Sequence, residues 1–150
     1  MTFIDTADSA TAYHCQNLLN LYALAQDTRD ADLFAGLFAE DARWERPVKN
    51  APVIGRAAIR HDIAELIRSR PETSRYQHII TNVICHSDEP GRAESGCYAL
   101  VFSGDAGKFD ELPPIALPAG ILRYRTRFSN QEGGWRITFH RAERLFTPSS

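Results

Sequence analysis

The histidine at position 78 stands where a side chain capable of chemistry is least expected. It lies in a stretch rich in β-branched and aromatic residues, 75–86, which predicts a strand. Because side chains alternate between the two faces of a strand, one face is predicted to carry Tyr76, His78, Ile80, Asn82 and Ile84. Both faces are largely apolar, so we expect the strand to be covered on both sides. A buried imidazole costs free energy unless it has a hydrogen-bond partner or a ligand, and His78 is a candidate for either.

Length and composition exclude several classes of protein. The 150 residues, of which 43% are hydrophobic and 24% charged, are typical of one globular domain spanning residues 1–150. Basic residues number 17 and acidic residues 19, a balance that does not favour binding of nucleic acid. No apolar run approaches the length of a membrane span, and residues 1–6 lack the features of a signal peptide. We therefore expect a cytoplasmic protein with neither membrane nor nucleic acid as a partner.

The sequence carries no motif typical of a metal site or an organic cofactor. Cys15, Cys85 and Cys97 are odd in number and widely spaced, which favours buried structural thiols over disulfides or zinc ligands. The histidines lack a spacing such as HExxH, and neither GxGxxG nor GxxxxGK[ST] occurs. The expected chemistry therefore uses side chains alone, with no metal and no cofactor.

The elements that must position His78 follow from hydrophobic periodicity. Apolar residues three and four apart predict helices over 10–26, 31–38 and 56–68, with Ser9 and Asp30 as the first two N-caps. Alternation predicts a short strand at 42–46 and then four long strands at 75–86, 93–103, 121–128 and 135–145. This order predicts an α+β domain: a cone-shaped barrel of a curved, mostly antiparallel sheet, packed against three N-terminal helices around a small-molecule cavity. The segment 104–120 is too long for a hairpin turn, and loops of that length are often functional.

Three parts of the sequence resemble the SnoaL-like branch of the nuclear transport factor 2-like superfamily, which includes scytalone dehydratase, bile-acid 7α-dehydratase and ketosteroid isomerase. They are Tyr22–Asp30 running into Leu37–Trp44, then Gly55–Ile59, and finally His78–Val83 with the closing Gly-Trp-Arg-Ile at 134–137. Together they span about residues 12–145. The resemblance implies the same α+β cone, whereas the reaction varies among members, some of which are not enzymes.

The resemblance also implies roles for four residues. In dehydratase-like members an Asp near the end of the first helix and a His on the first long strand form a catalytic dyad, and the matching positions are Asp27 and His78. A Tyr five residues before that Asp implies Tyr22, and an Arg on the final strand implies Arg141. A carboxylate holds an imidazole in one tautomer and makes it a better proton acceptor. Such a pair can remove a proton beside a carbonyl and return it, while a phenol and a guanidinium stabilise the developing negative charge.

Each of these residues also has a purely structural interpretation. Asp27 lies at a helix end and is also consistent with a cap for the following helix, although Asp30 suits that role. His78 is also consistent with a satisfied core histidine, and Tyr22 with a core aromatic residue. The alternative for Arg141 is a salt bridge, either with Glu143 or with Asp41.

Five further residues are predicted to lie at the cavity: Trp44, Asn82, Phe38, Phe102 and Phe139. Asn82 shares the predicted face of His78, and its alternative role is to cap a backbone group. The four aromatic residues are either cavity lining or plain core. The other histidines are predicted to lie on a helix surface or at strand edges, at positions 61, 86 and 140.

The sequence therefore predicts a cofactor-independent lyase or isomerase of the dehydratase kind, acting through Asp27 and His78. Its substrate is expected to be a small hydrophobic molecule, cyclic or polyketide-like. The alternative is a non-catalytic protein of the same fold, which binds a small ligand or serves as a scaffold like the β subunit of ring-hydroxylating dioxygenases. The resemblance implies a homodimer or a homotrimer.

Overall fold

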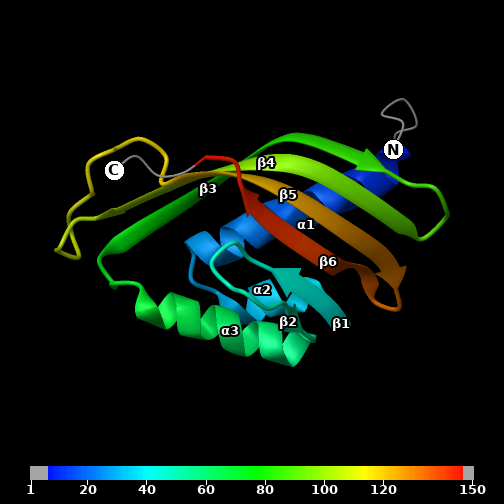
Figure 1. Ribbon diagram of the computed structural model, residues 1–150, viewed down its shortest axis with the longest axis horizontal. Coiled ribbons are helices and arrows are strands. Elements are labelled where there is room, and N and C mark those ends of the chain that lie inside the picture. The colour runs from blue at the N-terminus through cyan, green and yellow to red at the C-terminus, as the bar shows by residue number, and fades with distance from the viewer. Residues whose placement is uncertain (1–6, 147–150) are drawn as a thin grey trace.

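A computed structural model describes residues 7–146, which form three helices and one six-stranded sheet (Figure 1). The helices are α1 (Ser9–Asp27), α2 (Ala31–Gly36) and α3 (Arg56–Ser69). The strands are β1 (Phe38–Glu45), β2 (Val53–Ile54), β3 (Ser74–His86), β4 (Arg92–Asp105), β5 (Gly120–Gln131) and β6 (Gly134–Arg144). The strand order is β2-β1-β6-β5-β4-β3, and every neighbouring pair is antiparallel except β1 with β6. The predicted α+β class is confirmed, with a curved, mixed sheet that is not closed.

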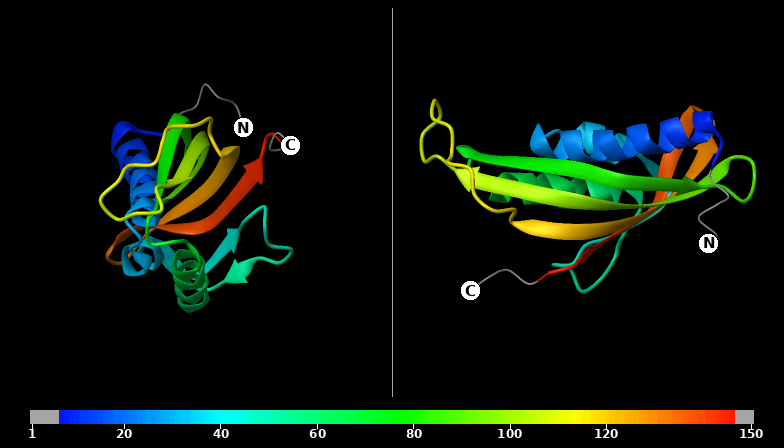
Figure 2. Two further views of the ribbon diagram at one scale, coloured as in Figure 1. Left: turned by 90° about the vertical axis from the view of Figure 1, so that its left-hand side faces the viewer. Right: turned by 90° about the horizontal axis from the view of Figure 1, so that it is seen from above.

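The three helices lie on the concave side of the curved sheet (Figure 2). The inward stripe of α1 repeats every three or four residues, as a helix with one buried face requires, and consists of Cys15, Leu18, Leu19 and Tyr22. The N-cap of α1 is Asp8 rather than the predicted Ser9, because the Asp8 carboxylate accepts hydrogen bonds from the N–H groups of Ala10 and Thr11. In the sheet, α1 packs chiefly on β3, and Asp27 in its last turn contacts His78 of that strand. No helix in the described part of the chain is long and apolar enough to cross a membrane.

Two bulges interrupt the alternation of side chains in the sheet. In β3 the pairing with β4 shifts after Thr81, and Asn82 takes a left-handed φ of 55°. In β6 the pairing with β5 shifts between Phe128 and Arg127, which leaves Thr138 as an extra residue. An extra residue bends a strand and reverses which face its following side chains occupy.

The bulges therefore overturn part of the predicted facing. Asn82 is exposed and does not share the face of His78, and Ile84 is exposed while Cys85 is buried. In β6, His140 was predicted to lie at a strand edge but is completely buried, at 0% exposure. Arg141 alternates with it and lies on the outer face of the sheet.

A left-handed residue fixes the end of α1. Arg29 has a φ of 60°, and its guanidinium donates to the carbonyl oxygens of Arg70 at 3.4 Å, Pro71 at 2.7 Å and Ser74 at 3.0 Å. It also donates to Oγ of Ser74 at 3.0 Å. These acceptors belong to the connection between α3 and β3. The last turn of α1 is thereby tied to the start of the strand that carries His78.

Candidate active site

The carboxylate of Asp27 contacts both the ring and the backbone of His78. Asp27 is the last residue of α1, and its Oδ1 lies 2.5 Å from Nδ1 of His78 on β3. Its Oδ2 accepts from the backbone N–H of His78 at 2.9 Å and from Nε2 of Gln77 at 3.2 Å. Both partners are largely screened from water, with side chains that are 6% and 11% exposed for His78 and Asp27. An acceptor at Nδ1 favours the tautomer with its proton there, which leaves a lone pair on Nε2.

The ring of His78 lines a cavity of about 260 Å³ on the concave side of the sheet. Within residues 7–146, no side chain or backbone group forms a hydrogen bond with its Nε2. The apolar part of the wall comes from α3, β4 and β5, through Leu66, Val101 and Leu122. The imidazole of His78 therefore lies at the wall of a small, partly apolar space, and its Nε2 has no hydrogen-bond partner within residues 7–146.

Tyr22 lies on the same cavity wall, five residues before Asp27 on α1. Its hydroxyl oxygen accepts a hydrogen bond of 3.0 Å from Nε1 of Trp44. Burial raises the pKa of the Tyr22 phenol far above its ordinary value, against the opposing effect of the Trp44 hydrogen bond. The phenol therefore remains protonated, and its O–H proton is free of the Trp44 contact. Tyr22 is suited to donate to an oxygen, and it is unsuited to act as a base.

His140 is a buried histidine that the sequence pattern did not reveal. Its ring lies 4.4 Å from the ring of Tyr22 and 4.7 Å from that of Tyr124, measured between centroids. Nδ1 lies 3.0 Å from Oγ1 of Thr126. Burial lowers the pKa of His140 to about 3, so the ring is neutral near neutral pH. His140 supports Tyr22 from behind and does not line the cavity.

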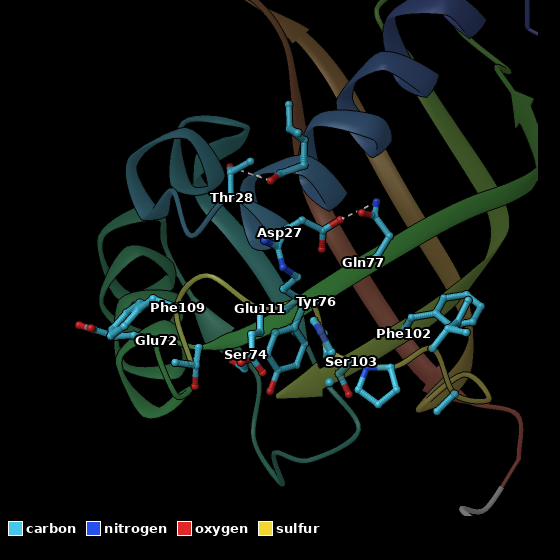
Figure 3. A pocket seen from close by; sticks show the side chains of 18 residues that line it. Asp27, Thr28, Glu72, Ser74, Tyr76, Gln77, Phe102, Ser103, Phe109 and Glu111 are labelled. Carbon is cyan, nitrogen blue, oxygen red and sulfur yellow. Dashed lines mark hydrogen bonds between the residues drawn. The ribbon is translucent and has the colours of Figure 1, made fainter. Parts of the chain in front are cut away.

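A second hollow lies on the other side of Asp27. Figure 3 shows this groove of about 540 Å³, with Asp27 and Gln77 pointing toward one another in its wall. Phe102 on β4 and Phe109 and Ile115 in the loop 104–120 contribute to its lining. The groove contains the carboxylate of the pair, whereas the inner cavity contains the imidazole. The two members of the pair therefore line different hollows.

Four of the predicted site residues lie away from the inner cavity, on the outer face of the sheet or at an exposed bulge. Phe102 lies on the outer face of β4 and lines the groove, while Asn82 is exposed at its bulge. Phe139 and Arg141 lie on the outer face of β6, where Arg141 pairs with Glu45. The predicted facing of Asn82 and Phe139, and the predicted cavity position of Arg141, are wrong because each residue follows or forms a bulge. The alternative predicted for Arg141, a salt bridge with Glu143, is present at 3.9 Å. Phe102 misses the cavity for a different reason: the small side chains of β4 face inward, and its large side chains, including Phe102, face outward.

Trp44 and Phe38 are core residues behind the cavity wall. Trp44 is 1% exposed and Phe38 is fully buried. Their rings surround Phe34, at centroid distances of 5.1 Å and 5.3 Å. Their connection to the site runs through Tyr22, which Trp44 hydrogen-bonds and Phe38 contacts edge-on.

Several polar cavity residues were not singled out from the sequence. Gln26 precedes Asp27 on α1, Arg46 follows β1, and Arg70 follows α3; all three line the inner cavity. The available signals were the alternation that places Arg46 on the face of Trp44 and the position of Gln26 beside Asp27. The three cysteines are buried free thiols, as predicted. Among residues 7–146, no three His, Cys, Asp or Glu side chains are grouped so as to hold a metal ion.

The fold is shared with proteins of known structure. A protein of unknown function from Mycobacterium tuberculosis has 23% sequence identity and a TM-score of 0.76, over 92% of this chain and 73% of that one. An NTF2-like protein with a cystatin-like fold from Novosphingobium aromaticivorans has 22% identity and a TM-score of 0.69, over 91% and 83%. A protein from Catenulispora acidiphila, solved in complex with S-DNPA, has 18% identity and a TM-score of 0.75, over 91% and 95%.

At these identities the similarity shows the fold alone. No curated protein matches the chain. The family itself is established by sequence, because the model of the SnoaL-like domain matches residues 8–141, most of the chain. This chain, in which Asp27 contacts His78 at the wall of the inner cavity, therefore belongs to the SnoaL-like family.

Proposed function

We propose that the protein is a cofactor-independent lyase or isomerase in which Asp27 and His78 form a catalytic dyad. The observation that carries this proposal is the 2.5 Å contact between Oδ1 of Asp27 and Nδ1 of a histidine that lines a cavity. A histidine held in this way is a general base at Nε2, and its carboxylate partner stabilises the imidazolium once it forms.

The proposed reaction moves one proton out of the substrate and back. Nε2 of His78 removes a proton from a carbon beside a carbonyl, and the electron pair of that C–H bond moves into an enolate. The imidazolium then gives the proton to a departing hydroxyl group, which leaves as water, or to another carbon. The first outcome is a dehydration and the second an isomerisation. Asp27 keeps its negative charge throughout and accepts from Nδ1–H.

Tyr22 is proposed to stabilise the enolate oxygen. It lies on the same wall, and its protonated phenol is a hydrogen-bond donor. Trp44 fixes the hydroxyl by donating to its oxygen. Arg141 has no part in this proposal, since it lies on the outer face of the sheet.

Three further observations support a small hydrophobic substrate. The SnoaL-like family includes polyketide cyclases and isomerases. The Catenulispora acidiphila protein, which has the same fold, was solved in complex with S-DNPA. A cavity of about 260 Å³ suits compounds of one or two rings.

A screen of cyclic β-hydroxyketones tests the proposal, because their dehydration gives a conjugated enone with strong near-ultraviolet absorbance. We expect turnover by the wild type and a loss of at least about a hundredfold in kcat for His78→Ala and for Asp27→Asn. His61→Ala serves as the matched control, since His61 is exposed on α3. Activity that survives both dyad substitutions would remove the dyad from the mechanism.

The second candidate is a non-catalytic binding protein. It is favoured by the hydrogen bonds from the His78 backbone and from Gln77 to Asp27, which a structural carboxylate would also make. This candidate predicts that ring compounds bind without any turnover. It also predicts that His78→Ala lowers stability, and that neither the wild type nor the variant shows catalytic turnover.

A further inference from the structure

The inner cavity has an excess of positive charge. Three arginines line it, Arg46, Arg70 and Arg144, while none of its lining residues in the described part of the chain is an aspartate or a glutamate. Arg46 is paired with Asp62 on α3, which Lys49 also contacts. Asp62 is thus shared by two cations. The other carboxylate beside the cavity is that of Asp27, which contacts His78 and also acts electrostatically on Arg70, and the three arginines still leave a positive balance.

Arg70 contributes a charge that no carboxylate in residues 7–146 neutralises by a salt bridge. Its guanidinium lies 3.9 Å above the ring of Tyr76, and its Nη1 donates to the carbonyl oxygen of Gln26 at 3.4 Å. Stacking on an aromatic face leaves the edge of the guanidinium, with its N–H groups, available to a ligand. The side chain is therefore held in place without being electrostatically satisfied.

Two donors beside Arg70 have no partner. Gln26 is 5% exposed, yet its Nε2 forms no hydrogen bond within residues 7–146. Nε of Arg46 is likewise buried and without a partner in that range, although another nitrogen of the same guanidinium contacts Asp62. A buried donor left without an acceptor costs about 1–3 kcal/mol. Both residues line the inner cavity, so a ligand whose acceptor reached these donors from the cavity would remove that cost.

We propose that Gln26, Arg46 and Arg70 form a subsite for a carboxylate, and that the substrates are hydrophobic ring compounds bearing one carboxylate group. A carboxylate has acceptor oxygens and a negative charge, which match amide and guanidinium donors in a positive environment. The subsite shares its cavity with His78 and Tyr22. The inference that this group belongs to the substrate rests on the proposed function, whereas the binding preference itself does not.

The binding preference is tested with 2-naphthoate and 2-naphthamide, which have nearly the same shape and differ in charge. Titration calorimetry on the wild type is expected to give at least about tenfold tighter binding of the carboxylate. Arg70→Met removes a charge of the subsite. Gln26→Glu keeps the shape of residue 26 and replaces the amide donor by a carboxylate that occupies the arginines itself.

Both variants should lose about tenfold or more in affinity for 2-naphthoate and stay within about twofold for 2-naphthamide. Arg68→Met is the matched control, because Arg68 is an exposed arginine two residues before Arg70, and its binding should equal that of the wild type. Thermal unfolding of each variant shows that it is folded, and two different substitutions keep the test valid should one of them fail to fold.

Equal binding of the two ligands by the wild type would overturn the subsite, as would undetectable binding of 2-naphthoate or a parallel loss of both ligands in the variants. The dyad is tested separately, because His78→Ala should keep the preference for the carboxylate. Carboxylate preference without dyad-dependent turnover leaves the subsite standing and removes the proposed reaction. Dyad-dependent turnover of neutral compounds without a preference for the carboxylate leaves the proposed reaction standing and removes the subsite.

Discussion

The carboxylate of Asp27 contacts His78 at two points, with Oδ1 2.5 Å from the ring nitrogen Nδ1 and Oδ2 2.9 Å from the backbone nitrogen. A negative charge in the last turn of a helix is opposed by the partial negative charge of the helix end, at a cost of about 0.3–1 kcal/mol. The contacts with His78 and Gln77 offset that cost. Because Asp27 binds both the ring and the backbone N–H of His78, the contacts also fix the orientation of the imidazole ring relative to the backbone of β3.

The tautomer of His78 is the first testable consequence of this contact. We expect long-range ¹H–¹⁵N spectra, recorded under mildly alkaline conditions, to show His78 protonated at Nδ1. Asp27→Ala removes the acceptor and should shift the population toward the Nε2-protonated form, while the exposed His61 stays unchanged. A wild-type His78 protonated at Nε2 would contradict the proposed base.

Substitution of Arg29 should loosen the end of α1. Arg29→Ala removes hydrogen bonds from a charged group to three carbonyl oxygens and should lower the free energy of unfolding by about 1.5–3 kcal/mol, measured in urea. Arg29→Gly loses the same bonds but accepts the φ of 60° without strain, so it should be about 1 kcal/mol more stable than the alanine variant. Equal stability of the two variants would argue against a left-handed conformation at this position.

Burial of His140 predicts a loss of stability in acid. Its pKa is about 3 in the folded chain against 6.5 for an ordinary histidine, so below about pH 6.5 the unfolded chain binds a proton that the folded chain does not. The free energy of unfolding should therefore fall by roughly 2–3 kcal/mol between about pH 7 and pH 4.5 on account of this group. The effect is absent above pH 6.5 and complete only below pH 3.

His140→Phe isolates that contribution, because phenylalanine keeps an aromatic ring between Tyr22 and Tyr124 and does not titrate. The difference in unfolding free energy between wild type and variant should change with pH over this window. Parallel curves for the two proteins would show that His140 takes up its proton as readily in the folded chain as in the unfolded chain, which would contradict its burial as a neutral ring.

Arg141→Met should leave the site unaffected. The side chain lies on the outer face of the sheet and pairs with Glu45, and an exposed ion pair contributes about 0–1 kcal/mol to stability. Affinity for 2-naphthoate should stay within about twofold of the wild type, in contrast to Arg70→Met. A tenfold loss of affinity in Arg141→Met would mean that the side chain of Arg141 faces the inner cavity and not the outer side of the sheet.

The fold and the central pair could be predicted from sequence because their signals are strong. Helical spacing over 10–26 and alternation over 75–86 correspond to α1 and β3, and the family resemblance places Asp27 opposite His78. The two-residue strand β2 was missed, since Val53 and Ile54 are too few to show a period. Its pairing with β1 depends on tertiary contacts.

The facing of side chains could not be predicted beyond the bulges. On either side of Asn82 both faces of β3 are apolar, so a shift by one residue leaves no mark in the hydrophobic pattern. The same holds in β6, where Phe139 and His140 exchange their predicted environments. The arginines of the cavity were missed for different reasons. Alternation in the predicted strand 42–46 placed Arg46 on the face of Trp44 but gave no sign that this face meets a cavity, and Arg70 lies just outside α3, where periodicity assigns no face.

Asp27 lines the outer groove and His78 the inner cavity, while Tyr76 and Ser103 line both hollows. A ligand in the groove and a ligand in the cavity would therefore each contact one member of the same pair. A compound in the inner cavity would compete with substrate. A compound in the groove beside Asp27 and Gln77 would leave substrate binding intact and lower the turnover rate, which makes it a non-competitive inhibitor.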